Sequence, residues 1–266
     1  MSTAKLAPNT DNLFLGKGAL YFDRFDAGDA KTGELDLGNV TAFGLTKAAT
    51  KKDHFTSREG IRKKDKSITI EEKWTAKFVA EEYSRENMLL AIGGELTPAY
   101  DTQSAGTGTA DITAFRDRWI AVGKRSISSV VVTHGGTTFT LNVDYKVDST
   151  IGRIMPLYTG AIYEGEPLHV VFSYASINQP ILKPSIREVK GFMRFVPHND
   201  MDNGPNYEAQ IWSCLLTCDS EIPFLTEDWG KLNFTVDIDE DDSGGTHKAT
   251  NPYFKLTEIK ASTIIS

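Results

Sequence analysis

The side chains that most often carry out catalysis or bind metals are present in this sequence, but no group of them has the spacing that such chemistry needs. The five histidines are scattered, and no two are placed as metal ligands on one face of a helix. The chain has no G-x-S-x-G nucleophile motif, no phosphate-binding P-loop and no dinucleotide-binding fingerprint. We therefore predict no catalytic residues, no cofactor, no metal site and no enzymatic activity.

Two acidic stretches suggest calcium at first. An EF-hand loop that began at Asp237, in DIDEDDSGG, would need glycine and glutamate where the chain has Asp242 and Lys248, so this match fails. The stretch HNDMDNG, residues 198–204, could bind a cation weakly, but a polar turn is the simpler interpretation.

The two cysteines, Cys214 and Cys218, lie in the segment WSCLLTC. If this segment is a strand, both side chains point to the same face but lie ~13 Å apart, beyond the reach of a disulfide. We predict two free thiols.

Residues 51–66, KKDHFTSREGIRKKDK, form the most basic segment of an acidic chain. The segment has a net charge of +4, whereas the whole chain has a net charge of −7. Nucleic-acid binding would be expected to require a basic chain or interleaved aromatic residues, and the segment contains only Phe55. Its basic residues are Lys51, Lys52, Arg58, Arg62, Lys63, Lys64 and Lys66.

The position of this segment suggests another role. It lies between two strand candidates, so we predict a long β-hairpin with residues 51–66 as its terminal loop and Gly60 in the turn. Such a protrusion is either a solvated loop or a docking element for an acidic surface of another copy. A contact between two different surfaces is heterologous, and its repetition builds a tube or filament.

Most other segments also predict strands. In residues 67–78, Ile68, Ile70, Trp74, Ala76 and Phe78 alternate with polar residues, and residues 231–239 repeat this pattern. One helix is predicted in SRENMLLAIGG, residues 84–94, with Ser84 as the N-cap and two glycines as the stop signal. Short strands with one helix indicate a mainly β fold, a sandwich or barrel.

The chain also divides into regions. Residues 97–113 are rich in Thr, Gly, Ala and Ser and predict a flexible link, and prolines near residues 178–185 mark a second joint. We predict a core built from residues 1–97 and 181–266, interrupted by a small inserted β-domain at residues 98–180. No apolar run is long enough to span a bilayer, and the N-terminus has no signal-peptide pattern, so we expect neither membrane insertion nor secretion by the general route.

Several motifs occur in order in the first part of the chain: GKGALYFDRF, the LGN that precedes a strand, the charged hairpin with S-x-x-G at Ser57–Gly60, and SRENMLLAIGG. With these motifs, the segment 37–94 above all resembles the major tail tube proteins of long-tailed bacteriophages. The resemblance continues in the C-terminal strands, in a turn at Glu227-Asp228-Trp229 and in NPYFKL. Together these segments cover a little over half of the chain, and the middle block departs from the shorter members of the family.

The resemblance implies a tail-tube β-sandwich or barrel with a flanking helix at residues 84–93 and an inserted domain on the tube exterior. Six copies would form a ring, and rings would stack through residues 51–66 and an N-terminal arm, residues 1–15. The partners implied are the protein itself, the tape-measure protein and genomic DNA passing through the lumen, and the tail terminator and distal tail proteins. The protein would be made in the host cytoplasm and would reside in the virion. Glu71 and Lys73 are candidates for the lumen wall.

A second hypothesis follows from the residues themselves. The chain could be a monomeric β-sandwich that binds a ligand such as a carbohydrate. This hypothesis predicts exposed aromatic side chains near loop tips, with Trp119, Tyr158, Tyr163 and Trp229 as candidates.

Overall fold

A computed structural model describes residues 13–57, 60–95, 99–185, 188–199, 205–241 and 251–259. The protein is mainly β, as predicted, with antiparallel sheets and a single helix in these residues. It divides into two compact units, residues 1–97 with 182–266 (unit 1) and residues 98–181 (unit 2). The limits of unit 2 differ by one residue from those of the insertion expected from the sequence.

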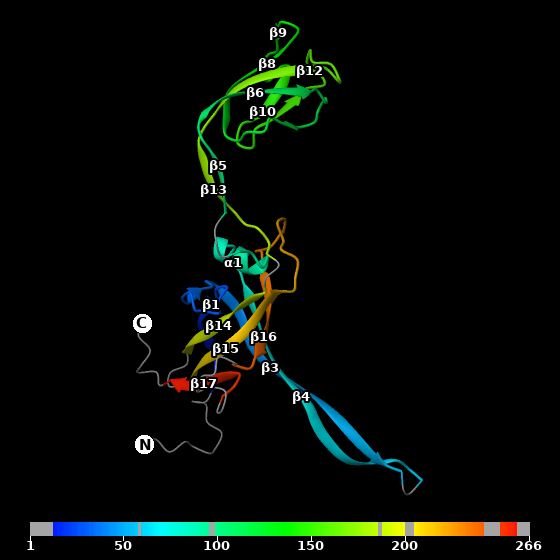
Figure 1. Ribbon diagram of the computed structural model, residues 1–266, viewed down its shortest axis with the longest axis vertical. Coiled ribbons are helices and arrows are strands. Elements are labelled where there is room, and N and C mark those ends of the chain that lie inside the picture. The colour runs from blue at the N-terminus through cyan, green and yellow to red at the C-terminus, as the bar shows by residue number, and fades with distance from the viewer. Residues whose placement is uncertain are drawn as a thin grey trace. The chain divides into compact units, whose positions relative to one another are not determined.

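Unit 1 is built on one large sheet with the strand order β2-β1-β14-β15-β16-β4-β3, in which β17 also pairs with β15 (Figure 1). Its elements are β1 (Gly16–Arg24), β2 (Leu35–Asp36), β3 (Val40–Thr56), β4 (Lys63–Ala80), α1 (Arg85–Ala91), β14 (Val189–Asn199), β15 (Asn206–Cys218), β16 (Leu232–Asp239) and β17 (Phe254–Ile259).

The core of unit 1 follows from strand alternation. In β16 the apolar residues Leu232, Phe234, Val236 and Ile238 are all buried, which confirms the predicted period of two. Phe234 stacks on Phe78 of the neighbouring strand, with ring centroids 4.7 Å apart. Alternate residues of β1 and β14 complete this apolar face.

Helix α1 begins where the sequence predicts. The Ser84 hydroxyl accepts a hydrogen bond from the Asn87 backbone N–H (3.1 Å), which caps the helix. The Asn87 side chain donates to the carbonyl of Leu37 (3.0 Å), and Leu90 packs into the core. The Asn87 hydrogen bond, together with the apolar contacts of Leu90, Met88 and Ala91, therefore holds this helix against the core of unit 1.

Unit 2 contains smaller sheets, one ordered β6-β12-β8-β9, one ordered β10-β11-β7 and a β13-β5 pair. Its strands are β5 (Ala99–Gln103), β6 (Gly106–Thr113), β7 (Ile120–Ala121), β8 (Ile127–His134), β9 (Thr137–Thr138), β10 (Tyr145–Asp148), β11 (Arg153–Pro156), β12 (Pro167–Tyr174) and β13 (Ile177–Ile181). They enclose a separate apolar core that includes Ile154, Val170 and Phe172.

One sequence-based prediction about this region is wrong. Most of residues 97–113 form β5 and β6 instead of a flexible link. β6 pairs along its whole length with β12, whose alternating apolar residues Leu168, Val170 and Phe172 supply the core side chains. Small and polar residues are therefore sufficient in β6 because its partner strand provides the burial.

The two thiols are free, as predicted. Cys214 is fully buried in β15, and its Sγ donates to the Gly191 carbonyl at 3.3 Å. Burial raises the pKa of the Cys214 thiol far above its usual value, so the thiolate that reactive cysteines need does not form there.

Candidate self-assembly surface: the β3–β4 ribbon

Strands β3 and β4 are 17 and 18 residues long and pair with each other nearly throughout. β16 pairs with β4 only between Trp74 and Ala80. Residues 47–73 therefore leave the sheet as a two-stranded ribbon, which we call the β3–β4 ribbon (Figure 1).

The loop at the end of the ribbon is shorter than predicted. β3 continues to Thr56 and β4 starts at Lys63, so residues 57–62 connect the strands, and Gly60 has the positive φ (+74°) of a turn residue. The predicted loop over residues 51–66 is too long, because residues 51–56 and 63–66 continue the pairing of the two strands. Opposite charges at diagonal positions of the two strands, such as Asp53 and Lys64, contact each other and stabilise the pairing.

The predicted basic residues cluster along this ribbon. Lys51 and Lys52 are exposed on β3, and Lys63, Lys64 and Lys66 are exposed on β4. Arg62 lies in the turn, with its guanidinium 5.5 Å from the centre of the Phe55 ring. Arg58 lies outside the described residues.

Two acidic residues of the segment are engaged within the ribbon. Asp53 accepts from Lys64 Nζ and from Ser67 Oγ, both at 2.7 Å, and Lys64 followed by Ser67 keeps the pKa of Asp53 below its usual value. Asp65 contacts His54 Nδ1 at 2.6 Å. These contacts join β3 to β4. Because residues 51–66 contain more basic than acidic side chains, the segment keeps a net positive charge.

The ribbon also exposes apolar side chains. Ile68 and Ile70, which alternation predicted on a buried face, are 49% and 58% exposed, and Phe55 and Ile61 are exposed as well. The reason is that β16 pairs with β4 only as far as Trp74, so the sheet does not extend beside the ribbon. Alternation predicts which face is apolar, but it does not say whether the same chain covers that face.

The two lumen candidates lie at the base of the ribbon. Glu71 is exposed. Lys73 Nζ lies 2.9 Å from Asp237 Oδ1 of β16, and this hydrogen bond raises the pKa of Lys73. The positive charge of Lys73 is therefore offset by a carboxylate of the adjacent strand.

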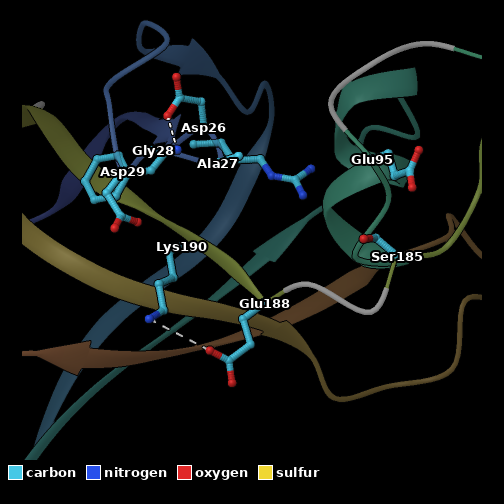
Figure 2. Close-up of a pocket in the computed structure, with 10 residues that line it drawn as sticks. Asp26, Ala27, Gly28, Asp29, Glu95, Ser185, Glu188 and Lys190 are labelled. Carbon is cyan, nitrogen blue, oxygen red and sulfur yellow. Dashed lines mark hydrogen bonds and ion pairs between the residues drawn. The ribbon is translucent and has the colours of Figure 1, made fainter.

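Unit 1 also contains an acidic hollow that sequence reasoning did not identify. Its volume is about 690 Å³, and acidic side chains from Asp26, Asp29, Glu95 and Glu188 line it together with Arg24 and Lys190 (Figure 2). Asp26 accepts from the backbone N–H groups of Ala30 and Gly28, and these bonds lower the pKa of Asp26. The carboxylate is therefore charged at neutral pH.

A second hollow of about 690 Å³ adjoins the first and shares Phe25, Asp29 and Lys190 with it. Consecutive acidic residues, Asp239, Glu240 and Asp241, line its far side. No short sequence motif predicts the two hollows, because residues from five separate stretches of the chain line them.

Within the described residues, no three His, Cys, Asp or Glu side chains are grouped as a metal site would require. Residues 200–204 and 242–245, which belong to the two acidic stretches, lie outside those residues. Among the described helical residues there is no helix long and apolar enough to cross a membrane.

Fold and surface together define a two-unit, mainly β protein with a long basic ribbon and an acidic pair of hollows in the same unit. Residues 13–257 match the model of a family described as "Protein of unknown function UCP028589". The chain belongs to this family. No curated protein matches the sequence.

Proposed function

We propose that this protein is a structural virion protein that self-assembles, through the β3–β4 ribbon, into the tail tube of a long-tailed bacteriophage. The observation that carries the proposal is the ribbon itself. It presents apolar side chains and excess positive charge that the described part of unit 1 does not cover. A two-stranded ribbon is only marginally stable alone in water, so a partner surface would stabilise it.

The acidic hollows supply a complementary surface on a second copy. They are lined by seven acidic and three basic side chains, whereas residues 51–66 carry seven basic and three acidic ones. Opposite charge on two different surfaces of one chain permits head-to-tail contacts, in which the ribbon of each copy binds the hollows of the next. Repeated contacts of this kind build an open stack.

The resemblance to tail tube proteins supplies the rest of the proposal. Stacked hexameric rings would enclose a channel through which the tape-measure protein and the genomic DNA pass, and terminator and distal tail proteins would bind the two ends. Unit 2 would lie on the tube exterior. Residues 1–15 would contact the neighbouring ring, and nearly all of that segment lies outside the described residues.

The test is whether the purified chain assembles, as measured by light scattering and negative-stain electron microscopy. The variant R62E/K63E/K64E reverses charge at the ribbon tip, and we expect it to remain a folded monomer that no longer stacks. A matched control, K146E/K183E/K255E, makes the same change of charge at exposed sites elsewhere in the chain. Tubes that form equally well from the tip variant would refute the role of the ribbon, and equal loss in both variants would indicate a general effect of charge.

A further inference from the structure

Two neighbouring loops of unit 2, residues 114–119 and 157–166, have an unusual set of exposed side chains. Every large apolar side chain that they expose is aromatic: Phe115, Trp119, Tyr158 and Tyr163. Tyr158 and Tyr163 are each 69% exposed, whereas the aliphatic Ile162 between them is fully buried. The loops thus bury their aliphatic residue and present ring surfaces to solvent.

Hydrogen bonds between the two loops hold these rings in place. The Asp117 N–H donates to the Pro156 carbonyl (2.8 Å), and the Tyr158 N–H donates to Asp117 Oδ1 (3.1 Å). Ala114 and Gly165 add further backbone bonds between the loops. A ligand that bound here would meet a surface that is already ordered, so little conformational entropy would be lost.

A second anchor lies beneath the 157–166 loop. The buried carboxylate of Asp144 accepts from the Thr140 N–H (2.7 Å) and the Ala161 N–H (2.8 Å). These two bonds keep the pKa of Asp144 below its usual value, so it is charged at neutral pH. The loop that carries both tyrosines is therefore fixed from both sides.

Arg116 lies close to both tyrosine rings. Its Nε donates to the Ile162 carbonyl at 2.7 Å, and its guanidinium carbon lies 5.4 Å from the centroid of each ring. The ring centroids are therefore no farther apart than twice that distance, so a ligand of one or two sugar units could contact both rings. The exposure of both rings means that the guanidinium leaves much of their surface open.

We propose that this surface, formed by Arg116, Tyr158 and Tyr163, binds a neutral glycan. The axial C–H groups of a pyranose carry partial positive charge and stack on the electron-rich face of an aromatic ring. Sugar hydroxyls at the ring edges can pair with the guanidinium of Arg116 and with the carboxylates of Asp117 and Glu164. Rigid rings next to both donors and acceptors match the alternating apolar faces and hydroxyl edges of a sugar chain.

The charges near the rings favour this ligand over polyanions. Arg116 and Arg118 are balanced by Asp117 and Glu164, and unit 2 as a whole has six basic and seven acidic side chains. A single-stranded nucleic acid would need a positively charged groove beside the stacking rings, and this unit has no excess positive charge to supply one. The inference does not depend on the proposed role of the ribbon, because it concerns unit 2 alone.

The experiment is saturation-transfer-difference NMR with the full chain and three probes at millimolar concentration, cellohexaose, chitohexaose and maltohexaose, followed by calorimetric titration. We expect at least one probe to bind, in high salt as well as in low salt. The variant Y158A/Y163A should weaken that binding by about ten-fold or more, a loss equal to about 1.4 kcal/mol. The variant Y158F/Y163F keeps the rings and should bind within a few-fold of the wild type.

The matched control is W229A, which removes another highly exposed aromatic side chain, in unit 1, and should bind like the wild type. Thermal unfolding checks that every variant is folded. The proposal is overturned if none of the three probes binds the wild type, if Y158A/Y163A binds as tightly as the wild type, or if W229A weakens binding equally. Binding that high salt abolishes would also overturn it, because charge and not ring stacking would then account for the interaction.

Discussion

Replacing the two exposed isoleucines of the ribbon would separate assembly from folding. In the variant I68T/I70T both positions keep a β-branched side chain, so the strand propensity of β4 is retained. Both residues lie where β4 pairs only with β3, and neither contributes to the core of unit 1. We expect the free energy of unfolding of the monomer to change by less than about 0.5 kcal/mol.

The effect on assembly follows from the exposed fractions. Full burial of an isoleucine side chain contributes about 1.5–3 kcal/mol, and these two are 49% and 58% exposed. If a neighbouring copy covers what remains, each contributes about 1 kcal/mol to the contact. The double variant should therefore weaken each ribbon contact by about 2 kcal/mol, which is about 30-fold in the association constant.

The assay is sedimentation of assembled material over a series of protein concentrations, which gives the critical concentration for assembly. The control V131T/V171T replaces two exposed, cross-strand valines in unit 2 and should leave that concentration unchanged. If I68T/I70T assembles at the wild-type critical concentration and its monomer is folded, no partner covers these side chains, and the argument from the ribbon fails.

Two further predictions concern stability within each unit. Trp74→Ala should lower the free energy of unfolding of unit 1 by about 3 kcal/mol, because its ring packs edge-on against Phe254 with centroids 4.8 Å apart; chemical denaturation measures this, and a change below about 1 kcal/mol would contradict it. Asp144→Asn should destabilise unit 2 by about 1–3 kcal/mol, because an amide cannot accept from both N–H groups. Because the folded pKa of Asp144 is depressed, its contribution is fully present above the unfolded pKa of about 4 and is lost as the pH falls through the folded value. Thermal unfolding should therefore show a loss of wild-type stability below about pH 4 that is smaller in Asp144→Asn, and equal acid sensitivity of the two proteins would refute this account.

The sequence predicted local features whose cause is local. The N-cap at Ser84 depends on residues within one turn of the helix. The period of two in β16 likewise reflects the geometry of a single strand. Such features can be predicted because no distant part of the chain is needed to specify them.

Features that depend on distant partners were missed. Residues 106–113 have a composition typical of a linker, yet they form a strand because β12, some sixty positions later, pairs with them. The acidic hollows combine residues 24–31 with Glu95 and with residues from Ser185 onward, and no short motif indicates that they meet. The exposure of Ile68 depends on where the pairing with β16 ends, which is a property of another strand.

The β3–β4 ribbon and the aromatic loops of unit 2 differ in charge and rigidity, and they therefore suit different kinds of binding partner. The ribbon combines excess charge with flexible side chains, and such surfaces set orientation and encounter rate for a macromolecule that carries the opposite charge. The aromatic loops are balanced in charge and fixed by hydrogen bonds, which suits stacking on a small repeating unit. Because the two features lie in separate compact units, a change in one should leave the other intact. A chain that lost assembly through R62E/K63E/K64E should therefore still bind a glycan, and this independence separates the two proposals by experiment.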